Sequence, residues 1–277
     1  MGNRIPKTIV DKILDKITHG DDFHAYIVIP MFPEGDAVSG AEPDQRQFEW
    51  NTMSFMARTV AKAARAKGKE WTDYLSFYFL ANWNNLASVT KGGDRQPRVQ
   101  SNKRYMVYVH SKLMICDDDY LIVGSANLNE RSLAGNRDTE ICVYMFADDG
   151  KLDAAKSTIQ GLRKKAWGEH FGGLPPSWDT PEKASCSSAM QSKGLANWIA
   201  FANAKRTDIS HLVSWPFEVD SAGTAFYVKT MNGGWIGAQD TFVFDAAADS
   251  YGTVSDLHWM WASPLGGAWA IPGSWAE

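Results

Sequence analysis

The stretch VHSKLMICDDDYLIVGSANLNERS, residues 109–132, decides how this chain is expected to fold and where its chemistry lies. Two apolar runs, one ending at Cys116 and one beginning at Tyr120, are separated by three consecutive aspartates. Runs rich in β-branched and aromatic residues favour strands, and aspartates favour turns. The stretch therefore predicts a strand, a tight turn and a returning strand.

Polar residues with chemical capacity flank this predicted hairpin. His110 and Lys112 are two apart, so on a strand they point to the same face, roughly 6.6 Å apart along it. Ser125 and Asn127 repeat that spacing on the returning strand, and Gly124 beside them allows close backbone approach. If the strands align, one surface presents an imidazole, an ammonium and two hydrogen-bond donors. Such a surface suits a phosphate diester, with its oxygen on the ammonium and its phosphorus facing the imidazole.

The nearby carboxylates are expected to have different tasks. Asp117 follows His110 by seven residues, an odd offset, so strict alternation points it away from the phosphate and towards fixing the turn or the local electrostatics. A reactive imidazole must be neutral at its attacking nitrogen, and a carboxylate bound to the other nitrogen fixes that tautomer. Glu140, at the start of the run ICVYMF, is the candidate, and Asp138 is its competitor.

Outward from the hairpin, apolar periodicity predicts alternating helices and strands. The helices are expected at 6–19, 45–67 and 151–167, and the strands at 23–32, 74–82, 105–116, 120–128 and 141–146. This order predicts an α/β layered fold in which helices lie on both faces of a largely buried sheet. Within such a sheet, Cys116 and Cys142 are expected to be buried free thiols.

The character of the sequence changes near residue 175. We expect a catalytic half-domain over residues 1–175 and a loop-rich, Trp- and Gly-rich C-terminal region over residues 176–277 that packs its aromatic side chains on the first part. Nine of the twelve tryptophans lie from Trp167 onward. A lipid-gripping surface is the alternative use of these tryptophans, since Trp suits the bilayer interface.

Composition narrows the function classes. The net charge of −4 and the sequence pI of about 5.9 provide no basic excess, so nucleic acid is not the expected substrate. The three cysteines are an odd number without metal-ligand spacing, and neither a metal site nor a cofactor is expected. The N-terminus lacks the apolar core of a signal peptide, and no apolar run of about twenty residues could span a bilayer. The expected location is the cytoplasm, with peripheral association with a membrane.

The ordered residues resemble the His-Lys-Asp (HKD) motif of the phospholipase D superfamily. Over about residues 3–175 the chain is similar to the C-terminal catalytic half of a plant-type phospholipase D. The matching segments are IPKTIVDKI, IVIPMFPEG, MSFMARTVAKAARAKG, YVHSKLMICDDDYLIVGSANLNERSLAGNRDTEI and WGEHFGG. The resemblance implies a phospholipase-D-like layered fold, with a mixed β-sheet flanked by helices on both faces.

The resemblance also assigns roles. His110 and Lys112 become catalytic, and Asp117 completes the motif. Glu140 orients His110, and Asn127, with Ser125 more weakly, holds the substrate phosphate. The implied reaction cleaves phosphatidylcholine-like lipids at a membrane surface into phosphatidic acid and a head group through a phosphohistidine, and a primary alcohol in place of water gives transphosphatidylation. His110 then corresponds to the second-motif histidine, the acid/base partner.

The chemistry implied by the family needs two HKD motifs, and this sequence has one. No other histidine is followed two residues later by lysine, which leaves His170 and His211 as the downstream candidates for a substitute partner. The sequence also lacks the C2 domain that precedes the catalytic region in plant-type enzymes, so the calcium dependence of that family is not supported.

Three hypotheses remain open from sequence. The first is a catalytic half whose second HKD motif comes in cis or in trans from another polypeptide segment. The second is a homodimer that pairs two identical motifs across a two-fold axis, as a phosphodiesterase or nuclease. The third is a catalytically incomplete fragment that binds lipid or phosphate.

Overall fold

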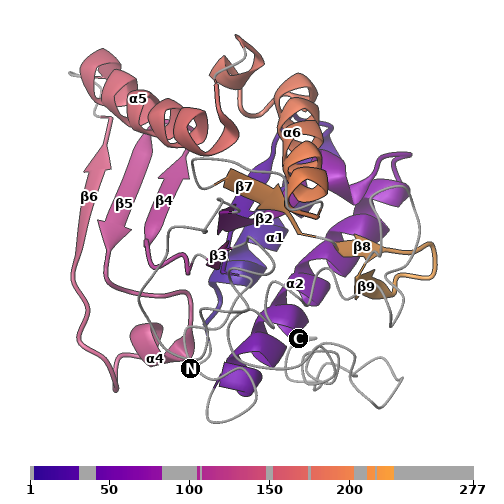
Figure 1. Ribbon diagram of the computed structural model, residues 1–277, viewed down its shortest axis with the longest axis horizontal. Coiled ribbons are helices and arrows are strands. Elements are labelled where there is room, and N and C mark those ends of the chain that lie inside the picture. The colour runs from indigo at the N-terminus through magenta and orange to yellow at the C-terminus, as the bar shows by residue number, and fades with distance from the viewer. Residues whose placement is uncertain are drawn as a thin grey trace, which may run out of the picture.

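The computed structural model describes residues 3–30, 42–82, 105–106, 108–147, 152–173, 176–202, 211–215 and 217–227. Its helices are α1 (Ile5–His19), α2 (Glu42–Arg65), α4 (Glu130–Leu133), α5 (Leu152–Phe171) and α6 (Ala184–Ala202), with 3-10 turns η1 (Trp71–Asp73) and η3 (Pro176–Asp179). Its strands are β1 (Ala25–Val28), β2 (Leu75–Asn82), β3 (Tyr105–Met106), β4 (Leu113–Cys116), β5 (Tyr120–Gly124), β6 (Cys142–Phe146), β7 (His211–Ser214), β8 (Phe217–Val219) and β9 (Ala225–Tyr227). The three long predicted helices and the strands on either side of the aspartates are confirmed, with shifted ends (Figure 1).

The main sheet is built around β2. Strand β1 runs parallel to it, and β3 and β7 run antiparallel, so the sheet is mixed. Ala81 pairs with Met106 on β3 and with His211 on β7, which places those two strands on opposite edges of β2. The predicted mixed sheet is therefore present.

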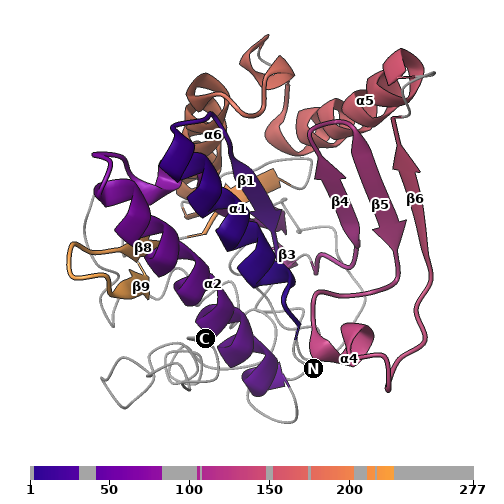
Figure 2. The ribbon, with the colours of Figure 1, turned by 180° about the vertical axis from the view of Figure 1, so that it is seen from behind.

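Alternating side chains of β2 point into two separate cores. Phe77 and Phe79 pack in a cluster with the buried faces of α1 and α2, including Ile13, which is fully buried. Tyr78, one residue out of phase, packs with Phe171 of α5 and residues of α6 and η3. Helices thus cover both faces of the main sheet, as the sequence pattern predicted (Figure 2).

A second sheet carries the predicted hairpin. Its order is β4-β5-β6, all antiparallel, with Met114, Ile122 and Tyr144 side by side across the three strands. The expectation that this sheet is largely buried is wrong: Cys142 is exposed and Cys116 is half-buried, although both are free thiols as predicted. Figure 2 gives the reason, because α5 lies across one end of these strands and covers neither face.

The chain beyond residue 175 contributes regular elements to the fold. Helix α6 packs against β7, and β7 itself pairs with β2 inside the main sheet. The small β8-β9 hairpin is attached to α2 through Arg65, whose guanidinium donates to the carbonyl oxygens of Val219 and Asp220, each at 2.6 Å. The predicted C-terminal region is thus joined to the first 175 residues by shared sheet and core, as far as residue 227; the rest of it lies outside the described residues.

Candidate active site

His110 lies where the chain passes from the main sheet to the second sheet. Strand β3 ends at Met106 in the main sheet and β4 begins at Leu113 in the second, so the single predicted strand over 105–116 is wrong. The segment from Tyr108 to Lys112 belongs to neither ladder, and His110 is exposed on it. The Lys112 ammonium donates to the backbone carbonyl of His110 at 2.6 Å, so the two motif residues are in direct contact.

The hairpin register places Lys112 opposite Gly124. The Gly124 amide donates to the Lys112 carbonyl at 3.1 Å. In this register Gly124, and not Ser125, is the residue that shares a face of the sheet with Lys112. The predicted need for glycine is confirmed: a Cβ on Gly124 would lie 2.6 Å from the Ile141 carbonyl oxygen and 2.7 Å from the Cys142 Cβ. This close approach brings the start of β6 to the motif.

Ser125 and Glu140 meet directly. The chain leaves β5 at Ser125, whose hydroxyl donates to the Glu140 carboxylate at 2.5 Å, and whose Oγ accepts from the Ile141 amide at 3.0 Å. The pKa of Glu140 is lowered first by the Ser125 hydrogen bond, then by one from Ser132, and further by the charge of Lys112. Lys112, Ser125 and Glu140 therefore form one electrostatic group, with the carboxylate ionised.

The other predicted polar residues lie close by in the chain. The Asn127 amide donates to the Ser132 hydroxyl at 3.1 Å, and the Asn129 side chain caps α4 by accepting from the Ser132 amide at 3.0 Å. The Asn127 residue is exposed. Asp138, the competitor of Glu140, accepts from Arg131 at 2.6 Å. An acidic residue already engaged with an arginine is a poorer candidate for orienting an imidazole, so Glu140 remains the prediction.

Asp117 occupies the hairpin turn. Its φ is +55° and that of Asp118 is +58°, while the Asp119 amide donates to the Cys116 carbonyl at 2.9 Å. Two consecutive left-handed residues are the pattern of a type I′ turn, and aspartate tolerates that region better than most residues. The structure places Asp117, exposed, in this turn at the opposite end of β4 from Lys112.

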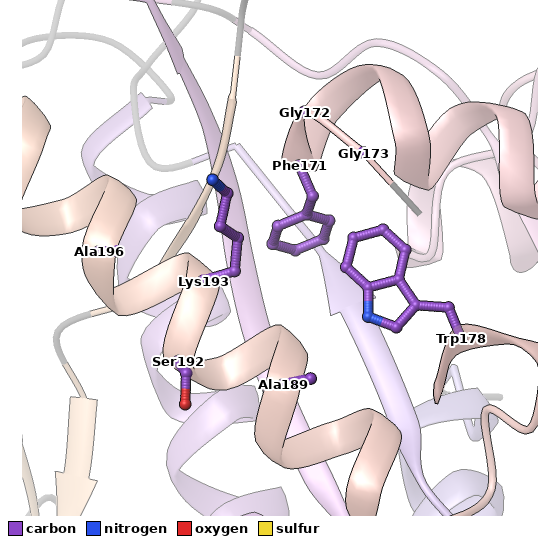
Figure 3. Close-up of a pocket in the computed structure, with 8 residues that line it drawn as sticks. All are labelled: Phe171, Gly172, Gly173, Trp178, Ala189, Ser192, Lys193 and Ala196. Atoms are coloured by element: carbon purple, nitrogen blue, oxygen red, sulfur yellow. The ribbon is translucent and has the colours of Figure 1, made fainter. Parts of the chain in front are cut away.

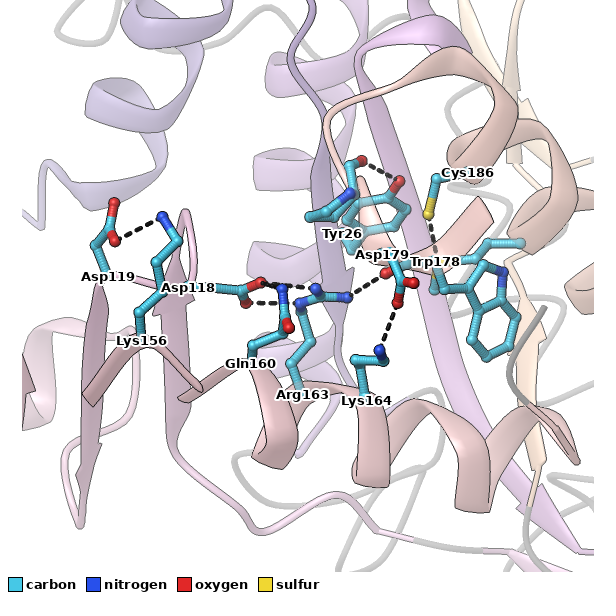
Figure 4. Close-up of polar contacts among 12 residues, drawn as sticks. Tyr26, Asp118, Asp119, Lys156, Gln160, Arg163, Lys164, Trp178, Asp179 and Cys186 are labelled. Carbon is cyan, nitrogen blue, oxygen red and sulfur yellow. Dashed lines mark hydrogen bonds and ion pairs between the residues drawn. The ribbon is translucent and has the colours of Figure 1, made fainter. Parts of the chain in front are cut away.

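The sequence reasoning missed what the next two aspartates do. Asp118 is buried and binds Arg163 of α5 through two hydrogen bonds of 2.7 Å, and Asp119 forms a 2.8 Å ion pair with Lys156 of the same helix (Figure 4). Both partners lie far from the turn in sequence. The only available signal was a run of three acidic residues where two would make the turn.

A cavity lies elsewhere in the described residues. Its volume is about 580 Å³, and it opens between the end of α5, η3 and α6 (Figure 3). Phe171, Trp178 and Lys193 are among its lining residues, and none of the predicted site residues is.

His170 and His211, the candidate substitute partners, are near each other. His211 is hydrogen-bonded to the backbone of His170, and burial is the main cause that lowers the His211 pKa. Among the described residues, no group of three or more His, Cys, Asp or Glu side chains could hold a metal ion. No helix in the described ranges is both long and apolar enough to cross a bilayer.

The comparison with known proteins agrees with the motif. The family model described as "Phospholipase D" matches residues 1–233, which include all the predicted site residues. The chain belongs to the phospholipase D family. The phospholipase D relatives include phospholipase D beta 1 of Arabidopsis thaliana, 35% identical over 238 residues, which are 80% of this chain and 22% of that protein.

Other plant phospholipases D are similar to the same extent. Phospholipase D alpha 2 of Oryza sativa subsp. japonica is 35% identical over 79% of this chain and 29% of its own length. Phospholipase D gamma 2 of Arabidopsis thaliana is 35% identical over 80% of this chain and 29% of its own length. The chain thus spans less than a third of these relatives, and the expected plant-type resemblance is confirmed.

Proposed function

We propose that this chain is one half of a phospholipase D-type phosphodiesterase that converts glycerophospholipids such as phosphatidylcholine to phosphatidic acid and a free head group. The observation that carries the proposal is the contact of Lys112 with His110 at the end of a hairpin whose returning strand leads to Ser125, which is hydrogen-bonded to Glu140. Asp117 completes the His-Lys-Asp set at the turn.

In the proposed reaction His110 transfers protons, and the histidine of the other HKD motif, which this sequence does not contain, attacks phosphorus. A P–N bond forms as the P–O bond to the head group breaks, and the His110 imidazolium protonates the leaving oxygen. Water then gives a proton to His110 and attacks phosphorus, which breaks the P–N bond. Lys112 has three donor protons, so its contact with the His110 carbonyl is compatible with binding a phosphate oxygen, aided by Asn127.

Glu140 is proposed to orient the His110 imidazole. Its carboxylate is held ionised by Ser125 and by the positive charge of Lys112. In this role the carboxylate accepts a hydrogen bond from one ring nitrogen of His110 and so fixes which nitrogen faces the substrate.

The second half of the site is proposed to come from further polypeptide, in cis or in trans. The support is the second sheet, which exposes apolar side chains on both faces: Val143 is 72% and Tyr144 is 69% exposed, on opposite sides of β6. A three-stranded sheet usually needs a covered face to be stable, and large exposed apolar patches mark interaction surfaces. The remaining members are Leu113, Met114, Tyr120, Ile122, Val123, Met145 and Phe146.

The homodimer is the alternative source of the second motif. If two copies form one shared site, a dimer in which one or both chains carry His110→Ala is inactive. Activity of a mixture then follows the square of the wild-type fraction. If each chain instead works with a different partner segment, activity falls linearly with that fraction.

The test is choline release from phosphatidylcholine vesicles, with vesicle sedimentation to measure the proposed peripheral membrane association. We expect His110→Ala to abolish release, and His19→Ala to retain it, because the His19 ring bonds only within its own helix, to the Asp15 carbonyl at 2.9 Å. Choline release that survives in His110→Ala would overturn the proposal.

Two further results would favour the other hypotheses. Hydrolysis of bis-nitrophenyl phosphate without lipid turnover would indicate a general phosphodiesterase or nuclease. Vesicle binding without turnover, unchanged in His110→Ala, would indicate a lipid-binding fragment.

A further inference from the structure

We propose that the buried Asp118–Arg163 ion pair is a positioning device that sets the place of the His110–Lys112 segment, an inference that rests on the proposed function. The pair joins the turn of the motif hairpin to α5. Arg163 and Asp118 touch no predicted substrate-binding residue in the contacts described above, so they are positioning residues and act through the strand between them and Lys112.

The pair has geometry suited to fixing an orientation. Arg163 Nε donates to Asp118 Oδ1 and Nη2 donates to Oδ2, each at 2.7 Å, and the side chains are 6% and 5% exposed. Two parallel hydrogen bonds define a plane as well as a distance, which a single contact does not. Among the ion pairs between described residues, this is the one in which both side chains are buried.

Arg163 is itself held from other sides. Its remaining terminal nitrogen donates to the Trp178 carbonyl at 2.9 Å, and its guanidinium lies 4.6 Å from the centre of the Trp167 ring. Gln160, one turn earlier on α5, donates to Asp118 at 3.3 Å. The guanidinium therefore has a fixed position relative to α5 and η3, and its bonds to Asp118 hold the turn in a fixed position relative to the same elements (Figure 4).

The hairpin turn also fixes the position of β4. Asp118 sits in the left-handed part of the turn, closed by the Asp119-to-Cys116 hydrogen bond. Strand β4 then spans only four residues, roughly 13 Å, before Lys112, whose carbonyl is bound by Gly124. A change of tilt at the turn is carried to Lys112 and His110 over that short distance.

Few other contacts could fix the tilt of the second sheet. Both faces of the second sheet are exposed, so side-chain packing does not fix its tilt. At the far end, the Asn3 side chain donates to the Leu128 carbonyl at 2.9 Å, an exposed contact. Figure 2 shows α5 against the turn end of the strands and α4 at the other end. Within the described residues, the turn is the principal buried attachment of this sheet.

The ion pair is better explained by placement than by stability. Buried ion pairs frequently add no more stability than apolar residues of the same volume, because removing both charges from water offsets their attraction. Removing one partner, by contrast, leaves an unpaired buried charge and damages the fold. The informative variant therefore changes both residues together.

The experiment compares two matched double variants. Asp118→Asn with Arg163→Gln neutralises the buried pair and keeps an asparagine at the left-handed position. Asp119→Asn with Lys156→Gln neutralises the neighbouring pair between the same turn and the same helix, whose side chains are 34% and 44% exposed. Arg163→Lys keeps the charge and removes the two-point contact.

Two measurements are made on each protein, namely phosphatidylcholine turnover and hydrogen exchange of individual segments. For the buried-pair variant we expect kcat to fall about tenfold or more with KM within about twofold, because lipid contacts remote from phosphorus are unchanged. We expect exchange to accelerate in residues 113–124 and to stay unchanged in α1 and β2. Arg163→Lys should fall between this variant and wild type, and the exposed-pair variant should match wild type.

The outcomes separate this inference from the proposed function. Wild-type kcat and wild-type exchange over 113–124 in the buried-pair variant would overturn the positioning role, as would faster exchange throughout the molecule, which would show a role in global folding. If the wild-type protein turns over no lipid even when the polypeptide that carries the other HKD motif is supplied, the proposed function fails, and the exchange pattern alone decides whether the pair positions the strand.

Discussion

The Ser125 hydroxyl donates to the Glu140 carboxylate at 2.5 Å, next to the close approach of Gly124 to the start of β6. The same hydroxyl oxygen accepts from the Ile141 amide, so it is fixed by the backbone of the residue that follows its partner. Lys112 adds positive charge near this carboxylate. The contact therefore links the returning strand of the motif to an acidic residue whose pKa the motif lysine helps to lower.

Removal of the Ser125 hydroxyl should raise the pKa of Glu140. The Ser125 hydrogen bond is the largest cause that lowers this pKa, and the bond from Ser132 is the second. We expect Ser125→Ala to move the Glu140 pKa back towards its ordinary value of 4.5, and Ser132→Ala to move it less. Carbon-detected NMR titration of the Glu140 carboxyl measures both. A wild-type pKa in Ser125→Ala would contradict the prediction.

Gly124→Ala should destabilise the protein by about 1–3 kcal/mol, because its Cβ would overlap the Ile141 carbonyl and the Cys142 side chain and push β6 from β5. Gly161→Ala on α5 is the control. A Cβ there meets nothing within 4 Å, so the helix should gain about 0.5–1 kcal/mol. Urea unfolding of both variants provides the two values, and equal effects would show that the close approach at Gly124 is not restrictive.

Stability should fall between about pH 6.5 and pH 4 because of His24. Burial lowers the His24 pKa from 6.5 to about 4, with the ring held by the Asp73 carbonyl and the Ser76 hydroxyl. In this window the unfolded chain binds a proton that the folded chain does not, so stability is complete above pH 6.5 and lost as pH falls. The full loss from this residue is roughly 3 kcal/mol.

Urea unfolding at a series of pH values measures that slope. His24→Gln should flatten the curve without removing it, because His211 also has a lowered pKa and contributes in the same direction. A slope that is unchanged in His24→Gln would show that other groups account for the acid sensitivity.

Arg65→Ala should release the β8-β9 hairpin from α2. Two charged hydrogen bonds of 2.6 Å to Val219 and Asp220 are lost, and the expected cost is about 2 kcal/mol. Segmental hydrogen exchange should rise over residues 217–227. Lys62→Ala, an exposed cation on the same helix, should leave that exchange unchanged, and equal exchange in the two variants would contradict the attachment.

Local patterns were sufficient to predict most elements and the motif. The apolar periodicity of residues 6–19 predicted α1, and two of its periodic apolar residues, Ile13 and Ile17, are buried. The aspartates predicted the turn, and the requirement for glycine at Gly124 is met by a close approach to β6. These features depend on neighbours along the chain, or on one adjacent strand, which a single sequence displays.

Features that depend on distant partners could not be predicted in the same way. Nothing in the sequence near Asp118 indicates that Arg163, on a later helix, is its partner. An apolar run such as ICVYMF predicts a covered strand and hence a buried Cys142, but both faces of β6 are exposed among the described residues. The hairpin register, which sets Lys112 against Gly124, likewise depends on the turn geometry.

The pairing of β7 with β2 bears on how the protein is made. Phe79 pairs with Val213, so one edge of β2 stays unpaired during synthesis until the ribosome has added more than a hundred further residues. Contacts this distant along a chain slow folding, and an open strand edge on a partly made chain is prone to pair with other molecules. Nascent chains arrested before β7 should therefore depend on chaperones far more than chains arrested after it.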